Sequence, residues 1–312
     1  MPALALTDLG NLFGSIKFYQ GARKKGIKPI LGCDVWITDE TDRNRPTRML
    51  LLCQSHAGYL LLSRLLSRAY RENQYHSRAE IDPSWLHLDH WGTQGLIALS
   101  GARHGDIGSA LLNNDTQSAM TQAKRWASLF PDRFYIEIQR DGHPNEALLV
   151  QRSLQLARDC NLPVVATQAI QFLNPEDFRA HEARVCIAEG YTLEDKRRPR
   201  NFTEQQYFKS QSKMLELFAD VPSALANTLE IAKRCSLELE LGINRLPLFP
   251  TPGNESLEQY LRDQAITGLQ KRMQQLFPTD EIRIEKLPRY QARLAFEVDT
   301  IIQMGFAGYF LI

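Results

Sequence analysis

The sequence predicts an α/β protein with a parallel sheet that is covered by helices on both sides. Short apolar runs recur along the first 170 residues and alternate with segments that have helical periodicity. The apolar runs, such as 134–138, carry apolar residues on both faces, which is typical of strands buried in parallel sheets. Hydrophobic residues make up 43% of the 312 residues, enough for a sizeable core. A closed βα barrel and an open doubly wound sheet both fit this pattern.

The strands are predicted from runs of five to nine residues that are too short for helices and rich in branched or aromatic side chains. Each run ends in a polar or glycine-containing turn, which limits its length. In chain order the predicted strands are 3–7, 29–37, 49–53, 95–100, 134–138 and 162–167.

The helices are predicted from apolar positions that recur on one helical face. Residues 117–130 are the clearest case, because Ala119, Ala123, Trp126 and Phe130 fall at i, i+4, i+7 and i+11. Pro222 favours a helix start, since the first turn needs no N–H there. The predicted helices are 15–25, 58–71, 106–112, 117–130, 146–159, 176–189, 211–218, 222–235, 256–276 and 288–304.

Charge, cysteine content and hydropathy exclude several classes of protein. The formal charge of +1 argues against a surface that grips nucleic acid or anionic membrane as a whole. The five cysteines are widely spaced and odd in number, which favours reduced thiols over a disulfide framework. No apolar run approaches the length of a membrane span, and the N-terminus lacks the features of a signal peptide. We therefore expect a cytoplasmic protein without membrane association.

Four candidate metal ligands, Asp8, Asp34, Glu137 and His181, lie at or beyond strand ends. In parallel sheets and barrels, ligands bind at the carboxyl ends of the strands. Carboxylates and histidine together are the side chains that a divalent-metal phosphoesterase uses. Helix capping and turn formation explain the aspartates equally well, and Asp8 in particular. Glycines 101, 105 and 108 follow a strand and either hold a phosphate or simply permit the turn.

A series of segments resembles one family. Residues 3–14, ALALTDLGNLFG, are similar to a motif of the PHP domain of bacterial DNA polymerase III alpha subunits, the C-family replicative polymerases. The order and coverage of further segments strengthen the resemblance and favour the proteobacterial branch. These segments are 26–32, 99–101, 130–137, 164–167, 180–185, 199–202, 226–235 and 304–312.

The resemblance implies an irregular βα barrel over residues 1–245, the PHP domain. Residues 246–312 are then a linker with three prolines and the mainly helical beginning of the polymerase palm. The family's first strand and helix, with paired histidines, would precede Met1, and the palm aspartates would follow Ile312. The resemblance thus implies an internal piece of a much longer polymerase that is inactive by itself.

The resemblance also implies that the PHP metal site is degraded. Asp8, Asp34, Glu137 and His181 remain as a remnant site that is not expected to function. Four other positions have lost the family's histidine or aspartate ligands: they are Leu9, Arg48, Ala169 and Gln171. A positive charge at Arg48 raises the cost of binding a divalent cation. We therefore expect no PHP metal.

The function implied by the resemblance is that of a scaffold. The parent protein would be a DNA-directed DNA polymerase, a nucleotidyltransferase that uses Mg²⁺ held by ligands outside this chain. Implied partners are the proofreading exonuclease subunit, other polymerase III holoenzyme subunits, and template-primer DNA bound by parts outside this chain. One alternative is a stand-alone metal-dependent PHP phosphoesterase, which the four lost ligands disfavour. The other alternative is a nucleic-acid-binding module, which the basic clusters at 23–28 and 196–200 suggest.

Overall fold

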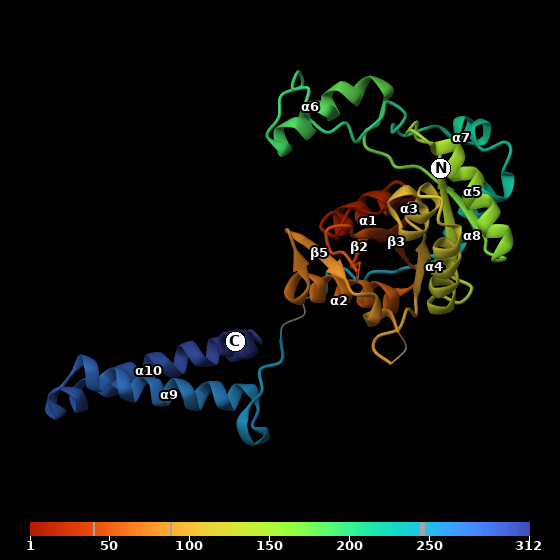
Figure 1. Cartoon of the computed structure of the whole chain (residues 1–312). Coiled ribbons are helices and arrows are strands. Elements are labelled where there is room, and N and C mark those ends of the chain that lie inside the picture. Colours follow the sequence, from red (N-terminus) through yellow and green to blue (C-terminus); the bar gives the residue numbers. More distant parts are fainter. Residues whose placement is uncertain (40, 88, 244–246) are drawn as a thin grey trace. The chain divides into compact units, whose positions relative to one another are not determined.

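The computed structural model describes residues 1–39, 41–87, 89–243 and 247–312 (Figure 1). The chain divides into two compact units, Met1–Leu239 and Glu240–Ile312. The expected domain boundary, between residues 245 and 246, lies outside the described residues. No helix in the described part of the chain is long and apolar enough to span a membrane.

The first unit is built on an eight-stranded sheet in the order β4-β5-β2-β3-β6-β7-β8, with β1 paired to β2. Pairing is parallel for β1–β2, β2–β5, β6–β7 and β7–β8, and antiparallel for β2–β3, β3–β6 and β4–β5. The strands are β1 (Ala3–Leu6), β2 (Lys28–Ile37), β3 (Thr47–Cys53), β4 (Gln74–Tyr75), β5 (Arg78–Ile81), β6 (Leu96–Leu99), β7 (Phe134–Gln139) and β8 (Val164–Thr167).

Helices follow most of these strands. In the first unit they are α1 (Ser15–Lys24), α2 (His56–Glu72), α3 (Asp106–Leu112), α4 (Thr116–Leu129), α5 (Glu146–Asp159), α6 (Phe178–Glu189), α7 (Gln211–Leu217) and α8 (Pro222–Arg234). Short 3₁₀ turns are η1 (Pro83–Leu86), η2 (Ala102–His104) and η3 (Pro175–Asp177). This alternation of strands and helices confirms the predicted α/β class.

The direction of β3 differs from the all-parallel sheet that the apolar runs predicted. The connection between Ile37 and Thr47 is too short for the crossover that a parallel pair needs, so β3 turns back along β2. The small β4–β5 hairpin was not predicted either. Its strands are short and partly polar, which is usual at a sheet edge.

The two faces of the sheet are buried by different elements. Leu31, Cys33 and Val35 of β2 face a core that also contains residues of α2 and α4. Because side chains alternate along a strand, Ile30 points to the other face, where Ile231 of α8 packs. The same alternation places Asp34 of β2 on the face that α8 covers, further along the strand.

The second unit consists of α9 (Leu257–Leu276), α10 (Asp280–Gln303) and α11 (Ala307–Leu311), preceded by the turn η4 (Pro252–Asn254). Figure 1 shows α9 and α10 lying alongside each other. The prediction that α10 starts at 288 was wrong. Pro288 lies inside the helix, where it costs one backbone hydrogen bond, and Asp280 and Glu281 supply the acidic first turn.

Candidate functional site

The carboxyl edge of the sheet gathers polar side chains on one face. Alternation along the strands places Asp34 and Arg48 on the same face as Ile30 and Leu52, which belong to the core cluster that includes Ile231 of α8. Glu137 lies two residues after Tyr135 of that cluster and therefore shares its face. This edge is where a parallel sheet positions its ligands.

Asp8 lies beside this edge through its backbone. The Asp34 amide donates to the Asp8 carbonyl at 3.1 Å, and the Gly10 amide donates to the Asp34 carbonyl at 2.8 Å. The Asp8 carboxylate faces the start of α1, since its Oδ2 would lie 3.3 Å from a Cβ built on Gly14. The N-cap of α1 is Gly14, and among the described residues no side chain caps this helix by a hydrogen bond, so Asp8 can act on it only through its charge.

Asp34 is paired with a cation from the same protein. Arg48 Nη1 lies 3.1 Å from Asp34 Oδ2, and the guanidinium carbon lies 5.5 Å from the centre of the Trp36 ring. Burial raises the pKa of Asp34 to about 6, while the Arg48 charge acts in the opposite direction. The position at which the PHP resemblance implies a histidine ligand thus carries the counter-ion of a remaining carboxylate.

Glu137 is buried and hydrogen-bonded at the centre of the edge. Its Oε1 accepts hydrogen bonds from Thr167 Oγ1 and, at 3.1 Å, from Gln139 Nε2. Burial raises the pKa of Glu137 to about 7, the Thr167 hydrogen bond lowers it, and the nearby Asp34 charge raises it further. This carboxyl group is therefore partly protonated at neutral pH.

His181 lies in an aromatic cluster on α6. Its ring centre is 4.6 Å from that of Phe202 and 5.5 Å from that of Phe172, and it is almost completely buried. Neither ring nitrogen has a hydrogen-bond partner among the described residues. Burial and, to a smaller extent, the Arg184 charge lower the pKa of His181, which favours the neutral ring. The structure brings Asp34 and Glu137 close together but shows no contact that links His181 to them.

The arrangement does not fit a divalent metal. Within the residues that the structure describes, no group of three or more His, Cys, Asp or Glu side chains is arranged to hold one. Asp34 is already neutralised by Arg48, and Glu137 accepts its hydrogen bonds from protein groups. A cation entering here would have to displace the guanidinium as well as shed its own water.

The glycines after β6 serve close packing. Gly101 has φ +75°, and a Cβ there would lie 2.1 Å from the Arg48 carbonyl oxygen. A Cβ on Gly105 would lie 1.8 Å from the Ser100 carbonyl oxygen. The turn into α3 therefore needs glycine whether or not a phosphate binds. The same glycines allow η2 to pack closely against β3 at Arg48.

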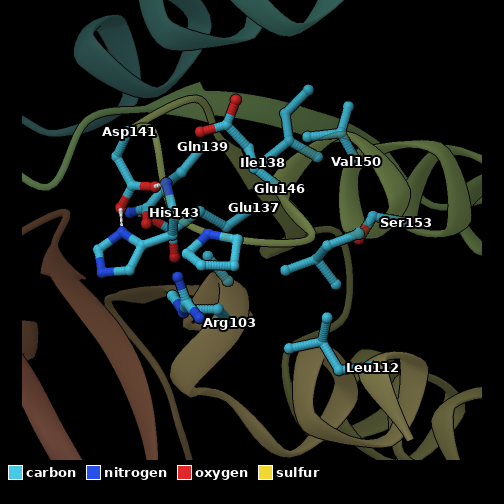
Figure 2. Close-up of a pocket in the computed structure, with 13 residues that line it drawn as sticks. Arg103, Leu112, Glu137, Ile138, Gln139, Asp141, His143, Glu146, Val150 and Ser153 are labelled. Carbon is cyan, nitrogen blue, oxygen red and sulfur yellow. Dashed lines mark hydrogen bonds and ion pairs between the residues drawn. The ribbon is translucent and has the colours of Figure 1, made fainter. Parts of the chain in front are cut away.

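A small cavity of about 20 Å³ lies between η2 and the loop after β7, enough for roughly one water molecule. Figure 2 shows Asp141 turned toward the His143 ring, with Arg103 and Glu146 also at the wall. His143 Nδ1 lies 3.0 Å from Asp141 Oδ2, and Nε2 lies 3.0 Å from the Asn201 carbonyl oxygen. Sequence reasoning missed this pair. The polar run after β7, with Asp141 and His143 two residues apart, was the available signal.

Comparisons with known proteins agree with this fold. Residues 1–141 match the PHP domain family. Over its whole length the chain is 50% identical to the DNA polymerase III subunit alpha of Neisseria meningitidis serogroup B, 45% to that of Pseudomonas aeruginosa and 44% to that of Escherichia coli K12. It covers 27%, 26% and 27% of those proteins, respectively, so it spans about a quarter of their length. The chain is thus similar over its whole length to the alpha subunits of proteobacterial DNA polymerase III, and its first 141 residues match the PHP domain family.

Proposed function

We propose that this chain is part of a replicative DNA-directed DNA polymerase and that its PHP domain is a non-catalytic scaffold for the proofreading exonuclease subunit. The relatives named above support the polymerase assignment. Template-directed nucleotidyl transfer with Mg²⁺ would belong to parts of the protein outside these 312 residues. Other holoenzyme subunits and the template-primer would likewise contact those parts.

The ion pair between Arg48 and Asp34 carries the scaffold proposal. A metal-dependent phosphoesterase needs several anionic or neutral ligands that converge on one cation. Here a guanidinium 3.1 Å from Asp34 supplies the positive charge from the chain itself. We interpret Asp8, Asp34, Glu137 and His181 as the remnant of a metal site, with Leu9, Arg48, Ala169 and Gln171 at its lost ligand positions. The fixed cation stabilises the edge without a bound metal.

The test is to purify the full-length protein and measure its metal content and its hydrolysis of p-nitrophenyl phosphate. We expect far less than one divalent ion per chain after dialysis, and no phosphatase activity above that of a buffer blank. Stoichiometric metal together with metal-dependent turnover would refute the scaffold role. Primer extension by the same preparation tests the polymerase assignment separately.

A further inference from the structure

One face of α1 is exposed and combines apolar and cationic side chains without an acidic one. We define the α1 face as Phe13 in the preceding turn together with Ile16, Lys17, Gln20 and Lys24 of the helix, all of which are exposed. Phe13 is 85% exposed and Ile16 is 39% exposed. Helical spacing places them on one side of α1, opposite the buried Ser15 and Tyr19.

The charged residues of α1 and of the segments that flank it in sequence are all positive. Residues 9–33 include five lysines and arginines and no aspartate or glutamate. Lys28 donates to the Ala232 carbonyl at 2.7 Å, and Arg23 lies over the Tyr19 ring. Lys17 and Lys24, by contrast, form no ion pair with any described carboxylate. These two ammonium groups therefore face solvent without a counter-charge.

Helix stability explains only part of this composition. Arg23 and Lys24 lie in the last turn of α1, where cations interact favourably with the helix dipole. Lys17 lies in the first turn, where a cation is unfavourable. The exposure of Phe13 has no stabilising explanation within the fold either. Lys17 and Phe13, in the N-terminal half of the α1 face, thus do not stabilise the isolated chain.

The backbone that carries the exposed aromatic ring is held in place. The Phe13 amide donates to Asn11 Oδ1 at 3.1 Å, and Asn11 Nδ2 donates to the Leu9 carbonyl at 3.0 Å. This Asx-type turn fixes the backbone on both sides of Asn11. An exposed aromatic side chain on a fixed backbone is typical of the residues that dominate binding energy at protein interfaces.

The protein itself indicates what kind of segment packs on α1. Residues 236–239, sequence SLEL, run past one flank of the helix, where the Leu239 amide donates to Tyr19 Oη at 3.1 Å. Leu237 and Leu239 pack against the core, while Glu238 between them is exposed. A segment that carries one glutamate between two leucines thus packs along one side of this cationic helix, with its leucines toward the core and its carboxylate exposed. The α1 face presents exposed apolar and cationic side chains on a side that is open.

We infer that the α1 face is a docking surface for an acidic, apolar-rich segment of a partner protein. Phe13 and Ile16 would contact apolar side chains of that segment, and Lys17 and Lys24 would pair with its carboxylates. Lysines that face solvent without counter-charges steer an acidic partner toward the surface and disfavour a basic one. The inference rests on the docking function proposed above and specifies where, and by what chemistry, the partner binds.

The test measures binding of the full-length protein to immobilised proofreading exonuclease subunit. The variants are Phe13→Ala and the double variant Lys17→Glu/Lys24→Glu. Lys124→Glu/Lys271→Glu is the matched control, because it reverses two exposed lysines elsewhere. We expect the first two to weaken binding about tenfold or more, and the control to bind like the unchanged protein. Thermal unfolding of each variant verifies that these surface changes leave the fold intact.

Contrary outcomes separate the two proposals. Binding that is equal in all variants would overturn the α1 assignment and leave exonuclease docking in place. Absence of binding by the unchanged protein would refute docking and, with it, this inference. A single-stranded oligodeoxynucleotide serves as a second probe. If the α1 variants lose a steeply salt-dependent affinity for it while exonuclease binding is unchanged, the surface contacts nucleic acid and the inference is wrong.

Discussion

The two units of this chain bury their apolar residues to very different extents. In Met1–Leu239 large side chains such as Trp126, Phe130 and Phe218 are completely enclosed. In the described part of Glu240–Ile312 the buried apolar residues are Met273, Val298 and Ala307, while Phe296 is 63% exposed. Both units show helical periodicity in their sequence, so periodicity predicts the helix but not whether its apolar side is covered. The first unit carries its own core, and the following predictions test that difference.

Trp126→Ala should give the largest effect. Trp126 is 1% exposed, and its indole N–H donates to Asp106 Oδ2 at 2.7 Å, so the substitution leaves a large cavity and an unpaired buried oxygen. We expect a loss of about 4 kcal/mol in the free energy of unfolding, measured by urea denaturation. Phe296→Ala in the second unit is the matched control and should change it by less than about 0.5 kcal/mol. Similar losses from both would abolish the contrast between the units.

Gly101→Ala tests how closely the first unit packs around Arg48. The new methyl group would lie 2.1 Å from the Arg48 carbonyl oxygen in a backbone that already has φ +75°. We expect a loss of about 3 kcal/mol, from strain and displacement of η2. Gly26→Ala has a similar φ of +72° with no atom within 4 Å, and should cost only about 1 kcal/mol. If both substitutions lower the thermal stability equally, the turn at Gly101 accommodates a methyl group as easily as the open position of Gly26 does.

Arg48→Leu tests the cation at the strand edge. Its side chain is 20% exposed and that of Asp34 is 24% exposed, so removing the guanidinium leaves a carboxylate poorly solvated. We expect a loss of about 2 kcal/mol at neutral pH and a further rise in the pKa of Asp34, followed by NMR titration. Arg45→Leu breaks a solvent-exposed pair with Asp42 and should be nearly neutral. If Arg48→Leu leaves the free energy of unfolding unchanged, the strand edge needs no cation.

The pH dependence of stability should show the smallest effect when it is expressed per pH unit. The pKa of Glu137 is raised from 4.5 to about 7 in the folded protein, so between these values the folded state binds more protons than the unfolded state. Its contribution is therefore complete below about pH 4.5 and is lost as the pH rises through about 7, by at most about 1.4 kcal/mol per pH unit. Glu137→Gln should remove this slope from urea-denaturation curves. A variant that retains the whole slope would assign it to other groups.

Local patterns predicted most of the first unit, and the misses have physical causes. The apolar runs predicted β2, β3 and β7 because burial on both faces leaves a continuous signal. The direction of β3 depends on the length of its connection, and α10 continues through Pro288 because one lost hydrogen bond does not end a long helix. The periodicity of apolar residues predicts neither the direction of β3 nor the continuation of α10 through Pro288.

The site was predictable to the extent that strand ends define it. Asp34 and Glu137 lie at the predicted edge, because position along a strand fixes the face and the end at which a side chain emerges. The placement of His181 depends instead on the aromatic rings Phe172 and Phe202, which are far apart in sequence. The Asp141 and His143 pair was missed because a loop has no period from which its geometry follows.

The contact between Lys28 and Ala232 constrains how the first unit is completed during synthesis. These residues are 204 positions apart, and Leu239 closes the same region on Tyr19 of α1. A ribosome adds about 5–20 residues per second, so this region waits roughly 10–40 seconds for its partner to be made. During that interval the basic helix has no acidic segment beside it and is open to other polypeptides in the cell.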